Sequence, residues 1–121
     1  QAGCYPAFVT ADWLRLAKRT MTLGSNGRIV FDYDMKIAEP FANADSAVPP
    51  DLWPAWSKLA ERPVLIIRGE RSDILTEAVA IKMQMTADQA ELVAVPRVGH
   101  APTLDEPEAV AAVERLLERV D

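Results

Sequence analysis

The stretch PVLIIRGERSDIL (residues 63–75) decides how the fold is predicted. Its first part is apolar at consecutive positions, which is typical of a parallel strand covered on both faces. A glycine at position 69 ends the apolar run, and Asp73 follows it. The pattern predicts a strand over residues 63–68 and, after it, a loop that carries a carboxylate.

The stretch LVAVPRVGHAP (residues 92–102) repeats this arrangement with a base in place of the acid. Its apolar start predicts a second strand, and the loop after it carries His100, the only histidine of the chain. Between the two strands the sequence predicts a helix capped by Thr76, with Val79, Ala80 and Met83 on one face. The loops after two parallel strands leave from the same sheet edge, so Asp73 and His100 can meet there.

An acid and a histidine at one sheet edge suggest two members of a hydrolytic triad. A carboxylate that accepts the Nδ1 proton of His100 would leave Nε2 free to take a proton from a nucleophile. Each residue also has a purely structural interpretation. Asp73 can be a helix-capping or turn residue, and His100 can be a loop histidine bonded to backbone. The acids at positions 105 and 106 are expected to begin the last helix, where negative charge is favourable.

The remaining elements are predicted mainly to be helices. Thr10 is expected to cap a first helix whose apolar residues reach Met21, and the turn sequence LGSNG (residues 23–27) is expected to end it. A short extended piece over 28–31, a helix over 35–41 and a loop over 43–50 follow. Asp51 is expected to cap a third helix, with Pro54 in its first turn. The predicted buried residues of this helix are Trp53, Trp56 and Leu59.

A last helix is predicted from residues 105–107 to Arg119, with apolar residues at the spacing of a surface helix that packs on a core. These apolar residues are Val110, Val113, Leu116, Leu117 and Val120. The order is therefore helices first and then β-α-β-α. The predicted helices are too few to cover both faces of two fully apolar strands. We therefore expect either a missing portion or a homo-oligomer to cover the sheet.

Composition limits the function classes. The chain has 121 residues, 50% hydrophobic and 26% charged, which fits one globular domain at most. Its net charge of −5 without a basic stripe argues against nucleic-acid binding, and no apolar stretch is long enough to span a membrane. One histidine and one cysteine cannot build a usual metal site, and no glycine-rich loop suggests a phosphate-bearing cofactor. Cys4 is interpreted as inert, and a reducing, cytoplasmic location is the default expectation.

The two loop sequences resemble the carboxyl-terminal part of the α/β-hydrolase superfamily. They are PVLIIRG (63–69) with Ser72-Asp73, and VGHAPTLDEPE (98–108). In that family the triad runs in the order nucleophile, acid, histidine. The resemblance implies that Asp73 is the acid and His100 the base. It also implies that residues 51–121 form the β-α-β-α end of the hydrolase core, and that residues 1–50 resemble the helical cap region and its return to the core.

The nucleophile of that family is not found here. It would sit in a G-x-S-x-G elbow between a strand and a helix. The nearest match is LGSNG (residues 23–27), which has leucine in place of the first glycine. No buried strand precedes it, so it is interpreted as a helix-ending loop. Ser46, Ser57 and Ser72 lack any such context. The elbow and the oxyanion donors are expected before Gln1, which suggests that the chain is a piece of a longer protein or a processed product.

Two function hypotheses follow. The first is a hydrolase of small esters, lactones or carbon–carbon bonds, present as a portion that is inactive alone, with Ser, Asp or Cys as the nucleophile of the complete protein. The second is a short non-catalytic binding or dimerisation module derived from the same fold. Aromatic and apolar residues of the first half could line a substrate pocket, although helix packing is the favoured interpretation. These residues are Trp13, Met21, Phe31, Tyr33 and Phe41.

Overall fold

The computed structural model describes residues 3–39 and 50–120. The chain divides into two compact units. One consists of Gln1–Ala7 together with Asp51–Asp121, and the other of Phe8–Pro50. The assignment of residues 1–50 to a cap and of residues 51–121 to the core stays a prediction, although the first seven residues cluster with the carboxyl-terminal unit.

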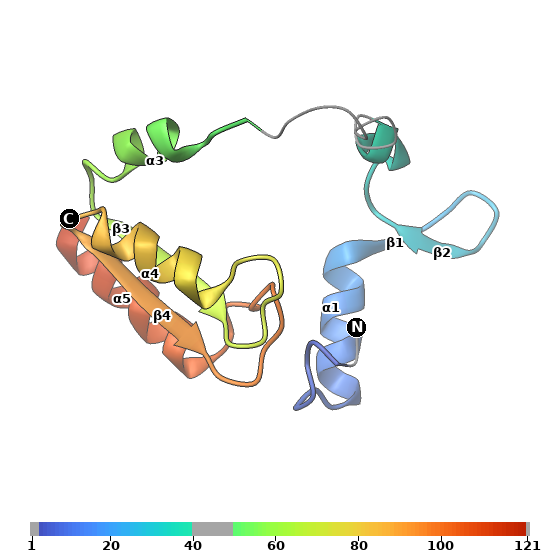
Figure 1. Ribbon diagram of the computed structural model, residues 1–121. Coiled ribbons are helices and arrows are strands. Elements are labelled where there is room, and N and C mark those ends of the chain that lie inside the picture. The colour runs from blue at the N-terminus through green and yellow to red at the C-terminus, as the bar shows by residue number, and fades with distance from the viewer. Residues whose placement is uncertain (1–2, 40–49, 121) are drawn as a thin grey trace. The chain divides into compact units, whose positions relative to one another are not determined.

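The carboxyl-terminal unit is built on two parallel strands. Strand β3 (Val64–Gly69) pairs with β4 (Ala90–Val95), and the register runs from Val64 opposite Ala90 to Gly69 opposite Val95. Figure 1 shows α4 (Glu77–Met85) and α5 (Pro107–Val120) on either side of this pair. The predicted β-α-β-α order is confirmed, and both strands end at the same edge.

The buried core of this unit consists of small and β-branched side chains. Val95, Val98 and Ala109 form one cluster, against which Tyr5 and Ile67 pack. Ile66 and Ala80 are also buried. Small residues let the helix backbones approach the sheet closely, so even one added methylene at these positions would be felt.

Helix α5 buries a different set of residues from the one predicted. Ala109 and Ala112 are fully buried, whereas Leu117 and Val120 are more than half exposed. Val110 is 40% exposed as well, so the prediction was wrong for these three: it followed large apolar residues, while the fully buried positions of the helix are alanines. Polar side chains also hold α5: Arg115 Nε donates to Glu91 at 3.1 Å, and the guanidinium of Arg119 donates to the Gln89 carbonyl at 2.8 Å.

Helix α3 (Trp53–Leu59) contacts α4 through its tryptophans. Trp56 Nε1 donates to Thr86 Oγ1 at 3.0 Å, and the Lys82 ammonium lies 3.8 Å from the Trp53 ring centroid, within cation–π range. The N-cap is Leu52, so the predicted Asp51 cap is displaced by one position, although Asp51 Oδ1 still accepts the Trp53 N–H at 3.0 Å. Leu59 is 61% exposed, so its predicted burial is wrong.

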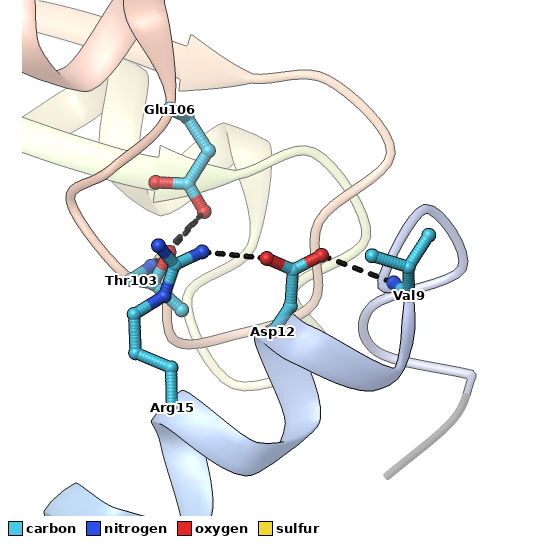
Figure 2. Close-up of polar contacts among 5 residues, drawn as sticks. All are labelled: Val9, Asp12, Arg15, Thr103 and Glu106. Carbon is cyan, nitrogen blue, oxygen red and sulfur yellow. Dashed lines mark hydrogen bonds and ion pairs between the residues drawn. The ribbon is translucent and has the colours of Figure 1, made fainter.

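The amino-terminal unit begins with α1 (Thr10–Thr20). Thr10 is the first helical residue and Val9 is the N-cap, so the predicted Thr10 cap is displaced by one position. Val9 has no side chain that can accept a hydrogen bond, and the Asp12 carboxylate is the acceptor at this helix end. Figure 2 shows its carboxylate accepting the Val9 N–H at 3.0 Å and pairing with Arg15 at 2.5 Å.

A β-hairpin follows α1 directly. Strands β1 (Met21–Leu23) and β2 (Ile29–Phe31) pair antiparallel, with Met21 opposite Phe31. The prediction that Met21 belongs to the helix was therefore wrong, and the LGSNG sequence forms the hairpin turn instead of a helix-ending loop. The turn closes through the Gly24 N–H to the Arg28 carbonyl, and Gly27 adopts the positive φ of 74° that such a loop requires.

The hairpin leads into a 3₁₀ turn, η1 (Met35–Ala38), whose first N–H groups Asp34 caps by accepting from Lys36 N at 2.9 Å. Of the predicted helix over 35–41, residues 35–38 form this 3₁₀ turn and Glu39 is helical, whereas residues 40 and 41 lie outside the described residues. Phe41 and the predicted loop over 43–50 lie outside the described residues, except for Pro50. Among the described helices, none combines the length and the apolarity that a bilayer crossing needs.

Candidate active site

The acid-bearing loop and the histidine-bearing loop meet at the carboxyl edge of β3 and β4. The Glu70 N–H donates to the Val95 carbonyl and the Arg71 N–H donates to the Val98 carbonyl, both at 2.9 Å. The Glu70 carboxylate also accepts the Arg97 N–H at 2.6 Å, where Arg97 turns the chain with a φ of 61°. These bonds extend the pairing of the strands into the loops and bring both loops to one edge, as predicted.

The two loops touch through backbone atoms. A Cβ atom built on Gly69 would lie 1.7 Å from the Gly99 carbonyl oxygen and 2.8 Å from the Val98 carbonyl oxygen. Real Cβ atoms do not tolerate such contacts, so only glycine allows this approach. Gly99 immediately precedes His100, and the close contact therefore fixes where the histidine backbone starts.

His100 is bonded to Ser72, the residue before the predicted acid. The Ser72 hydroxyl lies 2.9 Å from His100 Nδ1, the nitrogen that the sequence analysis assigned to Asp73. The Asp73 side chain is exposed and forms no hydrogen bond or ion pair within residues 3–39 and 50–120. The structure thus brings the Asp73 loop to the histidine but gives the Nδ1 contact to Ser72. The catalytic roles of Asp73 and His100 stay predictions.

The burial and contacts of Ser72 differ from those of a serine nucleophile. Its side chain is nearly buried, with 7% of the residue exposed, and its Oγ accepts the Leu75 N–H at 3.0 Å. A serine nucleophile needs an accessible Oγ bonded to the base nitrogen that takes its proton, which in a triad is Nε2. The prediction that Ser72 lacks the context of a nucleophile agrees with these contacts.

Cys4 and Tyr5, near the start of the chain, also bond to the histidine loop. The Cys4 carbonyl accepts the Gly99 N–H at 2.7 Å, and the Tyr5 hydroxyl donates to the Ala101 carbonyl at 2.5 Å. These bonds bracket His100. Burial raises the pKa of the Tyr5 hydroxyl above its ordinary 10.0, and the charges of Cys4 and Glu106 raise it further. The hydroxyl therefore stays a donor at neutral pH.

The loop from His100 to α5 has its own support. Figure 2 shows the Glu106 carboxylate next to Thr103, whose N–H and hydroxyl both donate to Glu106 Oε1 at 3.0 Å. Leu104 turns the chain with a φ of 64° between these residues. Glu106 therefore holds the loop that leads into α5, and the predicted effect of its charge on the helix stays a prediction.

Residues considered for an apolar pocket form ring contacts in the amino-terminal unit. Phe31 and Tyr33 stack with their ring centroids 5.5 Å apart, and both stay about half exposed. Trp13 meets Phe8 edge to face at 5.0 Å. Helix packing alone does not account for Phe31 and Tyr33, because they lie in or after a strand and face outward.

Sequence reasoning missed three residues that contact the candidate site. Ser72, Cys4 and Tyr5 all reach the histidine loop from far along the chain, with separations of 28 residues for Ser72 and 96 for the Tyr5 bond. No local pattern signals such contacts. Within the described part of the chain, no group of three His, Cys, Asp or Glu side chains is placed to hold a metal ion.

A parallel strand pair whose two loops carry an acid and a histidine at one edge is typical of the carboxyl-terminal part of the α/β-hydrolase fold. The sequence profile of the Alpha/beta hydrolase family matches residues 2–113. The chain belongs to this family.

Known relatives support this assignment. The chain is 57% identical to an alpha/beta hydrolase from Novosphingobium aromaticivorans of known crystal structure, with a TM-score of 0.87 over 98% of this chain and 41% of that one. It is 25% identical to E-2-(acetamidomethylene)succinate hydrolase, with a TM-score of 0.63 over 99% of this chain and 42% of that one. A 3-hydroxybutyrate-oligomer hydrolase from Cupriavidus necator is 36% identical over 83 residues, which is 65% of this chain and 28% of that protein. The chain thus spans less than half the length of each.

Proposed function

We propose that the chain is the acid- and histidine-bearing portion of a hydrolase that uses a nucleophile–histidine–acid triad. His100 acts as the base and Asp73 as the acid, while the nucleophile and the oxyanion donors lie outside this chain. Three findings support the proposal: membership of the family, the 41% and 42% of the structural relatives that the chain spans, and three relatives described as hydrolases.

One observation carries the proposal most directly. The histidine loop and the loop of Asp73 are bonded to each other at the carboxyl edge of two parallel strands, with His100 exposed there. Open α/β sheets bind ligands outside the carboxyl ends of their strands. Within the described residues, His100 Nε2 has no hydrogen-bond partner, so this nitrogen is available to a substrate or a nucleophile.

The reaction proposed is acyl transfer to water in two steps. His100 takes the proton of the nucleophile as it attacks the carbonyl carbon, and then gives that proton to the leaving group. In the second step His100 takes a proton from water as the water attacks the acyl-enzyme, and gives that proton back to the enzyme nucleophile as the acid product leaves. The carboxylate of Asp73 stabilises the imidazolium form in both steps. An ester is the favoured substrate class, since an oligomer of 3-hydroxybutyrate is joined by ester bonds; lactones and carbon–carbon bonds stay within the same chemistry.

Activity of the complete protein tests these roles. We expect His100→Ala to lower kcat on an activated ester by about 10⁴-fold or more, and Asp73→Asn by a similar factor, because both change the base. The measurement is steady-state hydrolysis of p-nitrophenyl esters and of a 3-hydroxybutyrate dimer by the protein encoded by the full reading frame.

The matched control is Asp88→Asn, which makes the same substitution at an exposed acid before β4, at the opposite end of the strand. This variant should keep its activity. Full turnover by the His100→Ala protein would refute the assignment. The 121-residue chain itself should show no hydrolysis above its own His100→Ala variant, and a full reading frame without a nucleophile elbow would favour a non-catalytic module.

A further inference from the structure

We propose that Tyr5 is a positioning residue for His100. Its hydroxyl donates to the Ala101 carbonyl at 2.5 Å, and the carbonyl of the neighbouring Cys4 accepts the Gly99 N–H at 2.7 Å. The two bonds hold the residue before the histidine and the residue after it. This inference rests on the proposed function for its catalytic meaning, whereas the restraint on the loop is a property of the chain itself.

The ring of Tyr5 is anchored on the elements that carry the histidine loop. It packs against the buried cluster of Val95, Val98 and Ala109, which belong to the end of β4, to the histidine loop and to α5. An aromatic side chain has only two rotatable bonds, so it loses little conformational entropy when it is held in one place. The hydroxyl therefore reaches Ala101 from a ring whose position is set by the core.

A second observation shows how closely this segment fits the histidine loop. A Cβ atom built on Gly99 would lie 2.7 Å from Cys4 Cβ and 3.0 Å from Cys4 Cα. Only a residue without a side chain admits Cys4 at this distance. The Gly99 carbonyl is also the group that approaches Gly69, so the residue before His100 is held by contacts with both segments.

A restraint on both sides of His100 matters because the histidine itself is exposed. An exposed side chain receives little support from packing, so the direction of its Cα–Cβ bond depends on the loop backbone. A general base must lie within hydrogen-bond reach of the proton that it takes, and a misplacement of about 1 Å can cost about 10²-fold in rate. Loss of the Tyr5 hydroxyl should therefore lower kcat and leave KM unchanged, since it acts on the base and not on substrate binding.

The test uses Tyr5→Phe in the protein encoded by the full reading frame. This variant keeps the ring that packs on the core and removes only the hydroxyl. We expect kcat on a p-nitrophenyl ester to fall about 10-fold or more, with KM within about twofold of the wild-type value. Hydrogen–deuterium exchange followed by mass spectrometry should be about 3- to 10-fold faster in peptides that cover residues 97–104, as the loss of one hydrogen bond predicts, and unchanged in α4.

Ser57→Ala is the matched control, because it also removes a hydroxyl that donates to a backbone carbonyl, here that of Trp53 in its own helix. It should leave kcat and the exchange of the histidine loop unchanged. Tyr5→Leu removes the ring as well and separates positioning from packing. If Tyr5→Phe behaves as the wild type and only Tyr5→Leu is impaired, the ring merely packs and the proposal is overturned.

Three other results for Tyr5→Phe would also overturn the proposal: faster exchange throughout the protein, a looser loop without a fall in kcat, or a fall in kcat without a looser loop. Failure of the proposed function has a different signature. If the wild-type protein hydrolyses no ester, that function fails, while the exchange data still decide whether Tyr5 holds the histidine loop.

Discussion

At the scale of single residues, two glycines set how closely the two loops of the candidate site approach each other. Gly69 ends strand β3 and Gly99 precedes the histidine, and their backbones are in contact. The atoms that would clash with a side chain at Gly69 are carbonyl oxygens, which cannot rotate away as a flexible side chain can. The separation of the two loops is therefore set by the absence of a single carbon atom.

We expect Gly69→Ala to lower the free energy of unfolding by about 3 kcal/mol, because the loops must move apart to admit the methyl group. Chemical denaturation followed by tryptophan fluorescence measures this change. Gly3→Ala is the control, since a Cβ there meets nothing within 4 Å. If both variants unfold at the same denaturant concentration, the close approach of the loops is not what the structure describes.

The residue scale also shows where sequence reasoning stops. The apolar run before Gly69 and the lone histidine predicted which loops meet, because strand direction alone decides that. The choice between Ser72 and Asp73 as the Nδ1 partner depends on side-chain directions at adjacent positions, which no periodicity reports. Tyr5 was missed for a related reason: its partner, Ala101, is 96 residues away.

At the scale of elements, helix ends are decided by side-chain acceptors. Thr76 caps α4 by accepting the Val79 N–H at 3.3 Å. At α1 the acceptor is Asp12, inside the first turn, and Thr10 has no capping role. The two threonines look alike in sequence, since each precedes a helical pattern, but only one satisfies an N–H of its helix.

We expect Thr76→Ala to lower the free energy of unfolding by about 1 kcal/mol through loss of the cap. Thr10→Ala should cost nothing, because Thr10 is the first helical residue and makes no capping bond, and alanine has the higher helix propensity. Thermal melts followed by circular dichroism compare the two. Equal losses in both variants would show that the caps are assigned wrongly.

Elements were predictable where one physical signal dominated. Both strands of the parallel pair were found from consecutive apolar residues, and α5 from its helical spacing. The extended piece predicted over 28–31 corresponds to β2, but β1 and the hairpin pairing were missed because Met21 continues the helical pattern of α1. The buried face of α5 was partly wrong because alanine gives little hydrophobic signal, although close packing favours it.

At the scale of the whole molecule, the parallel sheet is small. Among the described residues, β3 pairs only with β4, so each strand has one edge without a strand partner. Parallel sheets usually have more strands, and open edges tend to pair with other chains. The expectation that a missing portion or a second copy covers the sheet remains a proposal, and it concerns the same edges.

We therefore expect the 121-residue chain alone to self-associate at micromolar concentration. Sedimentation velocity over a range of concentrations should show a weight-average mass above the 13.3 kDa of one chain. The longer protein proposed above should not need this contact to cover the sheet. A chain that sediments as a monomer and melts cooperatively would contradict the expectation.

The clustering of Gln1–Ala7 with Asp51–Asp121 has an evolutionary consequence. In sequence, residues 8–50 separate the two parts of that unit. The first part contains Tyr5, which bonds to the histidine loop, and the second begins at Asp51. Closing a longer or shorter excursion changes the free energy only slowly, by about 0.6 kcal/mol for each doubling of length. Evolution can therefore change the length of this stretch at little cost in free energy to the unit that holds the histidine loop.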